Sequence, residues 1–99
     1  LEKIELHTPL YDSYTGPNVS FSFTAFDVKD SVLTCNIHVN DLVRDNITAI
    51  SHNITEITLE IPHSGVYFWN ISCTNSTLAD LSSLTWMFKR DDIPPSVSL

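Results

Sequence analysis

Residues 66–74, VYFWNISCT, decide the fold of this chain. Apolar side chains take every second position of this stretch, in the order Tyr67, Trp69, Ile71 and Cys73. Phe68, Asn70 and Ser72 stand between them. Because successive side chains of a β-strand point to opposite faces, the alternation predicts a strand with one buried face and one solvated face.

The same period of two recurs along the rest of the chain, in segments rich in β-branched and aromatic residues. It predicts strands over residues 2–8, 18–27, 32–39, 56–61, 66–74 and 83–89, with one or two short strands inside 42–50. Turn-forming residues separate these segments, and residues 75–83 are expected to form a longer polar loop. Six or seven short strands in a chain of this length predict an all-β fold, an Ig-like, fibronectin-III-like sandwich of two antiparallel sheets.

Composition narrows the class of protein further. The chain has 99 residues, which suits one domain, and 42% of them are hydrophobic, which is too many for intrinsic disorder. Only 17% are charged, and the net charge is −7. Because phosphate binding needs clustered Lys and Arg, we expect no nucleic-acid partner. No apolar run approaches the length of a membrane span, so no membrane contact is expected from this segment.

The two cysteines, Cys35 and Cys73, both fall on the inward phase of a predicted strand. In an Ig-like strand order these strands are neighbours in one sheet, so a disulfide would join adjacent strands and close a loop of about 39 residues. Spacing alone leaves a second interpretation open, in which both cysteines are reduced and buried as small hydrophobic side chains. The four histidines have no metal-ligand spacing, so no metal site is predicted.

Five of the seven asparagines begin an Asn-X-Ser/Thr sequon, whereas chance predicts about 1.5. The five are Asn18, Asn46, Asn53, Asn70 and Asn75. Asn70 takes the outward phase of its strand, Asn18 begins a strand, and the other three are expected in loops. A Ser/Thr/Asn-rich composition is the alternative source of sequons. We expect N-glycosylation at some of them, and the export that this implies favours the disulfide.

Three stretches of the chain carry a family resemblance. They are IELHTPLYD at 4–12 with VSFSF at 19–23, SGVYFWNISCTN at 64–75, and FKRDDIPPSVSL at 88–99. The second is similar to the G-x-Y-x-W-x-V-x-C-T-D strand, and the third to the F-x-V-D-x-x-P-P-x-V-x-L joint, of tandem Ig-like repeats in archaeal and bacterial surface proteins. Cys35 matches the family's earlier cysteine. Residues 75–80, NSTLAD, lack the family's Asp-x-x-Gly-Asn, so the conformation of that loop does not carry over.

The resemblance implies a non-catalytic extracellular spacer, adhesin stalk or surface-layer part. Its partners would be neighbouring Ig-like domains or identical subunits. Residues 97–99, VSL, also look like a restart of residues 4–6, IEL, which favours a tandem or head-to-tail arrangement. We therefore predict a domain over residues 1–93, with 94–99 as a Pro-Pro linker and the start of a following repeat.

Other candidate sites have a simpler structural explanation. Four aspartates lie near predicted sheet ends: Asp27, Asp30, Asp91 and Asp92. Calcium could use such oxygen ligands, but without a DxDxDG loop we expect solvated surface carboxylates. Trp69 and Trp86 take inward phases and are expected in the core. The exposed aromatics are expected at Phe68 and at Tyr11 or Tyr14, too scattered for a sugar-binding platform, although Phe68 beside Asn70 could mark a contact with a neighbouring subunit.

No catalytic constellation is present in the sequence: we find no G-x-S-x-G elbow, Ser/His/Asp set or carboxylate pair in a cleft. We predict a protein that is not an enzyme and needs no cofactor, namely an N-glycosylated extracellular spacer, adhesin stalk or fibre subunit. One alternative is a glycan- or receptor-binding module with its specificity in the loops after 18–27 and 66–74. Another is a membrane-proximal domain of a fusion or viral glycoprotein.

Overall fold

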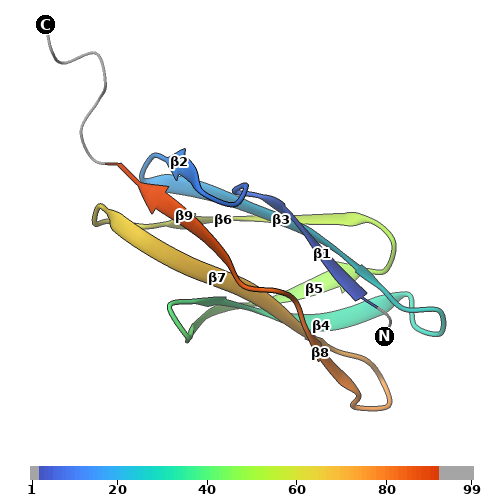
Figure 1. The fold of residues 1–99 in the computed structure, drawn as a ribbon. Coiled ribbons are helices and arrows are strands. Elements are labelled where there is room, and N and C mark those ends of the chain that lie inside the picture. Colours follow the sequence, from blue (N-terminus) through green and yellow to red (C-terminus); the bar gives the residue numbers. More distant parts are fainter. Residues whose placement is uncertain (1–2, 92–99) are drawn as a thin grey trace, which may run out of the picture.

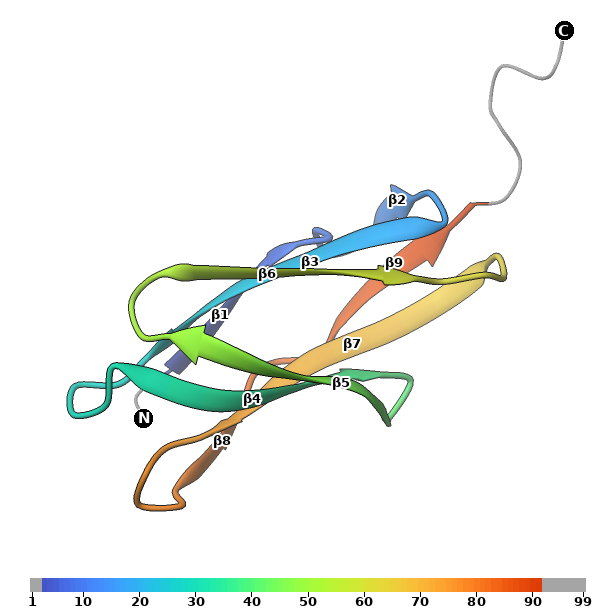
Figure 2. The ribbon, with the colours of Figure 1, turned by 180° about the vertical axis from the view of Figure 1, so that it is seen from behind.

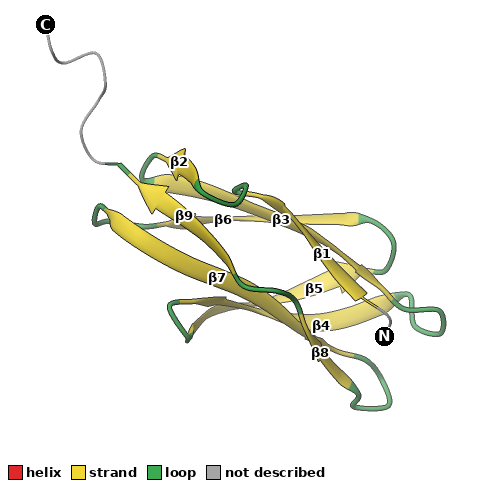
Figure 3. Cartoon of the chain, viewed as in Figure 1, coloured by secondary structure: helices red, strands yellow, loops and turns green. Residues whose placement is uncertain are grey.

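The computed structural model describes residues 3–91. All regular structure in this range is β-strand (Figures 1 and 3). The nine strands are β1 (Lys3–Thr8), β2 (Ser13–Thr15), β3 (Asn18–Phe26), β4 (Val32–Val39), β5 (Leu42–Ile50), β6 (Ile54–Glu60), β7 (Gly65–Thr74), β8 (Asp80–Ser82) and β9 (Trp86–Arg90). No helix among these residues is long and apolar enough to cross a membrane.

Two sheets pack face to face, as the sequence predicts. One has the order β1-β3-β6, and the other has the order β2-β9-β7-β4-β5, with β8 also paired to β7. Figure 2 shows the edge strands β5 and β6 along one side of the sandwich. Neighbouring strands are antiparallel except for β2 and β9, which run parallel, so the expectation of purely antiparallel sheets is corrected at this edge. The fold is an Ig-like, fibronectin-III-like β-sandwich.

The core lies between the inward faces of β3 and β7. Phe21 on β3 and Trp69 on β7 are both fully buried and meet edge to face at 5.1 Å between ring centroids. Phe88 on β9 adds a second edge-to-face contact to Phe21 at 5.7 Å. Each fully buried large side chain stabilises the fold by about 1.5–3 kcal/mol relative to exposure, so these three rings hold the sheets together.

The segment 42–50 forms one nine-residue strand, β5, where the sequence predicts one or two short strands. The turn before it explains the difference. Asn40 and Asp41 form a two-residue loop with φ of 52° and 66°. Positive φ at both positions is the geometry of a type I′ turn, whose twist matches that of the strands it joins. Asn and Asp tolerate positive φ better than most other residues, and the turn directs residues 42–50 back along β4.

The last predicted strand, 83–89, begins later than expected. β9 pairs with β7 over Gly65–Trp69, whereas β8 pairs with β7 over Ser72–Thr74. Between them, Ser83 exchanges hydrogen bonds with Ile71: its N–H donates to the Ile71 carbonyl at 2.8 Å, and its Oγ accepts the Ile71 N–H at 2.9 Å. The predicted loop 75–83 therefore contains the short strand β8. The sequence also missed β2, whose three residues are too short for a periodic signal.

One end of the sandwich is closed by polar contacts around the turn from β6 to β7. The hydroxyl of Tyr67 donates to the carbonyl of His63 at 2.7 Å, the arrangement of a tyrosine corner. Arg90 is only 6% exposed, and its Nε donates to the Ile61 carbonyl at 2.9 Å. Gly65 has a φ of 150°, which an L side chain rarely adopts. Together these contacts set the path of the chain into β7.

Replacing Tyr67 by Phe tests the corner. The ring stays stacked on Phe88, but the hydrogen bond to His63 is lost. We expect Tyr67→Phe to lower the free energy of unfolding by about 1 kcal/mol, measured by urea titration. Tyr11→Phe is the control, because Tyr11 is 61% exposed, and it should leave the midpoint unchanged. Equal midpoints for all three proteins would contradict the role of the corner.

Candidate functional site

The predicted disulfide is present. Cys35 on β4 and Cys73 on β7 are direct partners across the pair of strands, and their sulfurs are bonded at 2.00 Å. Both cysteines are buried. The bond therefore joins neighbouring strands of one sheet and not the two sheets, as the sequence predicts.

Removing the disulfide should be costly. It links residues 38 positions apart, and a crosslink of that span restricts the unfolded chain by about 4 kcal/mol. We expect the double variant Cys35→Ala, Cys73→Ala to lose about that much unfolding free energy, measured by urea titration. The oxidised and reduced wild-type proteins provide the matched comparison. A loss below about 1 kcal/mol would show that the crosslink is dispensable.

Four of the five sequon asparagines offer their side-chain amides to solvent or to an open face. Asn18 is exposed at the start of β3, Asn53 is exposed in the turn before β6, and Asn70 is half-buried on the outer face of β7. Asn46 is exposed but lies in the middle of β5, so its predicted loop position is wrong. The tight turn at Asn40 and Asp41 lets residues 42–50 form one continuous strand. Within residues 3–91, none of these four amides has a hydrogen-bond partner.

Asn75, the fifth, lies in the expected loop but is used differently. Its Nδ2 donates to Oδ2 of Asp27 at 3.1 Å. Its Oδ1 accepts the backbone N–H groups of Thr77 at 3.1 Å and Ala79 at 3.0 Å. Both ends of this amide are therefore occupied, and the side chain connects the loop after β7 to the loop after β3. Sequence alone does not distinguish this asparagine from the other four.

Asp27 is the buried partner in that connection, with 3% of its surface exposed, so the expectation of a solvated carboxylate is wrong here. Its Oδ1 accepts the N–H groups of Lys29 at 2.8 Å and Asp30 at 3.1 Å. The Lys29 N–H, then the Asn75 amide, then the Asp30 N–H hold the pKa of Asp27 far below its ordinary value of 3.8. Each of these donors favours the charged carboxylate.

A second contact ties the same two loops together, since the carboxylate of Asp30 accepts the N–H of Ser76 at 2.8 Å and also its hydroxyl. Asp91 is exposed at the end of the described range, and Asp92 lies outside it. Among residues 3–91 no group of three or more His, Cys, Asp or Glu side chains could hold a metal ion. Asp27 and Asp30 serve as hydrogen-bond acceptors for the loops at their end of the sandwich.

Acid should reveal the role of Asp27. A lowered folded-state pKa contributes stability above the unfolded-state value near 3.8, and that stability is lost as pH falls below it. We expect the Tm of the wild type to drop more steeply between pH 5 and pH 2 than that of Asp27→Asn, which should already be less stable at pH 7. Asp41→Asn, an exposed turn residue, should keep the wild-type slope. Parallel curves for wild type and Asp27→Asn would contradict this role.

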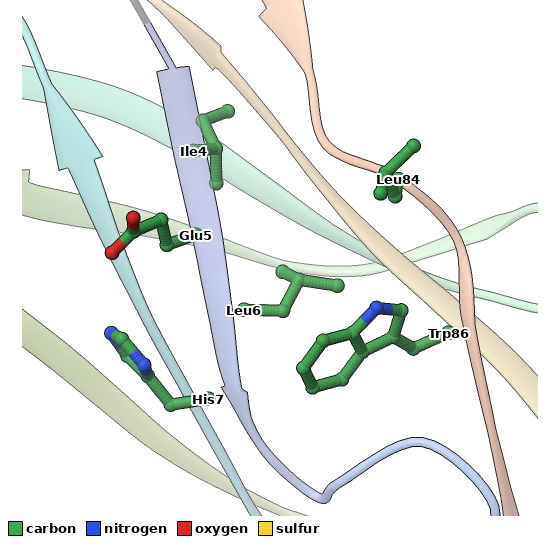
Figure 4. A pocket seen from close by; sticks show the side chains of 6 residues that line it. All are labelled: Ile4, Glu5, Leu6, His7, Leu84 and Trp86. Atoms are coloured by element: carbon green, nitrogen blue, oxygen red, sulfur yellow. The ribbon is translucent and has the colours of Figure 1, made fainter.

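An open groove of about 290 Å³ lies beside the edge strand β1 (Figure 4). Its lining residues are Ile4, Glu5, Leu6, His7, Leu84 and Trp86. In Figure 4 the indole of Trp86 points toward Leu6, while Glu5 and His7 project from the other side of β1. Trp69 is in the core as expected, but Trp86 is only partly buried, because the strand β9 starts at that residue and leaves its flank uncovered.

The exposed aromatic side chains lie apart from this groove. Tyr11 is 61% exposed, Tyr14 on β2 is 68% exposed, and Phe68 on β7 is 51% exposed. Tyr14 lies against the ammonium group of Lys89, which is 5.1 Å from the ring centroid and also pairs with Asp12 at 2.9 Å. The ring of Phe68 is on the outer face of β7, the same face as Asn70.

Two solved structures share this architecture. The first is the CARDB domain of the PF1109 protein from Pyrococcus furiosus, solved in complex with di-metal ions. It matches with a TM-score of 0.65 at 12% sequence identity, over 92% of this chain and 93% of that chain. Fibronectin(III)-like modules of Clostridium thermocellum CbhA match with a TM-score of 0.62 at 14% identity, over 90% of this chain and 94% of that chain. No protein-family model matches the sequence, and no curated protein does.

These similarities define the class of the protein by its fold. The chain is a β-sandwich module of the Ig-like and fibronectin-III-like kind, with a CARDB domain and fibronectin(III)-like modules as structural neighbours. Modules of this kind are typically non-catalytic. At 12% and 14% identity the likeness extends to the fold and not to the ligands of those proteins.

Proposed function

We propose that this chain is an N-glycosylated extracellular structural module, a spacer, adhesin stalk or fibre subunit that joins neighbouring Ig-like domains or identical subunits. The observation that carries the proposal is the placement of the sequons. Four asparagine amides without protein partners are distributed over the two sheets, an edge strand and a turn, in residues 3–91. Sugars at these positions would cover much of the outer surface.

One further observation supports an extracellular location, and a second gives the sugar proposed on Asn46 a structural role. The chain has a buried disulfide, and disulfides of this kind persist mainly in oxidising compartments. The sequon at Asn46 lies in the middle of the edge strand β5. The free backbone groups of an edge strand invite pairing with another chain, and a sugar there would block that pairing.

The arrangement of the strands suits a linear chain of modules. β1 begins at one end of the sandwich, and β9 ends at the other (Figure 1). Modules joined through such ends extend in one direction, as repeat proteins do. The proposed linker over residues 94–99 lies outside the described residues, as does the end of the proposed domain over 1–93.

The groove beside β1 favours a second candidate function, a glycan- or receptor-binding module. An open apolar groove with a partly exposed indole suits a sugar ring or an apolar peptide. The loops after β3 and β7, where the sequence places such specificity, are instead tied to each other through Asp27 and Asp30. In this candidate function a glycan or receptor would contact Trp86 and the exposed Leu84 of the groove.

Glycopeptide mapping of the native protein tests the first proposal. We expect sugar on Asn18, Asn46, Asn53 and Asn70, and the lowest occupancy on Asn75, because the amide of Asn75 is held against Asp27 and the loop backbone. Replacing Asn18, Asn46, Asn53 or Asn70 by Gln should remove one glycan in each case, and Asn75→Gln should change the glycan mass least. An intact mass equal to that of the bare polypeptide would overturn the proposal. Electron microscopy of native material separates a fibre subunit, which would show filaments, from an isolated spacer.

A further inference from the structure

We propose that the exposed ring of Phe68 is the docking platform for the first sugar of the glycan on Asn70. The contact lies within one chain, and its ligand is a pyranose ring attached to the Asn70 amide. This inference rests on the proposed glycosylation of Asn70 and adds a specific role for one aromatic side chain.

The placement of the two residues carries the inference. Phe68 and Asn70 are two positions apart on β7, so both side chains stand on its outer face, roughly 6.7 Å apart along the strand. The intervening side chain, Trp69, is fully buried on the opposite face. A sugar bonded to Nδ2 of Asn70 therefore starts within reach of the Phe68 ring.

The backbone of Phe68 is held by hydrogen bonds, which fixes the direction in which its side chain leaves the strand. Its N–H donates to Oδ1 of Asn40 at 2.9 Å, and its carbonyl accepts the N–H of Asn40 at 2.8 Å. On its other side Phe68 is opposite Met87 of β9. Phe68 is nevertheless 51% exposed, so part of its side chain is available to a ligand.

The side-chain amide of Asn70 is not engaged by the protein in the described range. Within residues 3–91 its amide makes no hydrogen bond, and it lies on β7 just after the segment paired with β9 and before the segment paired with β8. Its neighbour across the sheet, His38, is bonded instead to the hydroxyl of Ser72 at 2.9 Å. No protein group therefore competes for the Asn70 amide in this region.

The chemistry of the two rings is complementary. The face of an aromatic ring carries partial negative charge, and the C–H groups on one face of a pyranose carry partial positive charge. Stacking them also removes apolar surface of Phe68 from water. An exposed aromatic beside a sugar is therefore more favourable than the same aromatic in solvent.

Asn70 is the only sequon asparagine in the chain with an aromatic residue two positions before it. The corresponding residues are Gly16, Arg44, Ser51 and Cys73 for the other four. Asn46 is the matched control, since it is also on a strand and exposed, but it follows Arg44. The effect we propose should appear at Asn70 and be absent at Asn46.

The test uses the full chain, made in a host that attaches N-glycans, with occupancy checked by mass spectrometry. The gain in Tm from the Asn70 glycan is measured against Asn70→Gln, in the Phe68 background and in Phe68→Thr. We expect a gain of several degrees with Phe68 and less than half of it with Phe68→Thr. Phe68→Tyr, which keeps the ring, should restore the gain. The gain from the Asn46 glycan should be the same in all three backgrounds.

A direct readout does not depend on stability. In NMR spectra the ring protons of the sugar on Asn70 should shift upfield relative to those on Asn46, and the shift should vanish in Phe68→Thr even if that variant is less stable. A glycan on Asn70 that shows neither this upfield shift nor a Tm gain that depends on Phe68 would overturn the inference and leave the proposed function intact. If Phe68→Thr loses self-association while the Tm gain from the Asn70 glycan stays the same, Phe68 belongs to a subunit contact instead. A bare Asn70 in the native protein would overturn both proposals at this site.

Discussion

The pairing of β7 with β4 is the interaction on which the rest of the structure depends. β7 also pairs with β9 and β8, so three of the other five strands of its sheet are bonded directly to it. Its inward face supplies Trp69, which touches Phe21 of the opposite sheet, and Cys73, which is bonded to Cys35 of β4. A domain of this size buries too little surface to be more than marginally stable, so a crosslink at the centre of the sheet is a substantial part of its stability.

The two ends of the sandwich are closed by polar contacts to backbone groups. At one end Arg90 donates to the Ile61 carbonyl, and Tyr67 anchors the turn before β7. At the other end Asp27 and Asp30 accept hydrogen bonds from residues of the loop after β7. Polar groups suit these positions, because chain turns leave backbone N–H and C=O groups that need partners when they are buried. The loops that often carry specificity in sandwiches are here part of the closure.

The same side-chain chemistry serves two purposes on this surface. The amide of Asn75 is bonded to Asp27 and stabilises a loop, whereas the amide of Asn70 has no protein partner and stands beside an exposed aromatic ring. Which purpose an asparagine serves depends on the groups that the fold brings to it. A sugar on Asn70 would then be a structural element of the outer face, and it would cover the exposed ring of Phe68.

The period of two in 18–27, 32–39 and 66–74 determines the strands and the inward faces on which Cys35 and Cys73 lie, because the side-chain pattern of a strand is local. The excess of sequons is likewise a property of the sequence alone. Only the tertiary structure decided that Asn46 lies on an edge strand, that Asp27 is buried and that the amide of Asn75 is occupied. These outcomes depend on a turn with two positive φ angles and on contacts between loops about 48 residues apart, as for Asp27 and Asn75. No local pattern records which loop will meet which, since that is set by how the two sheets pack.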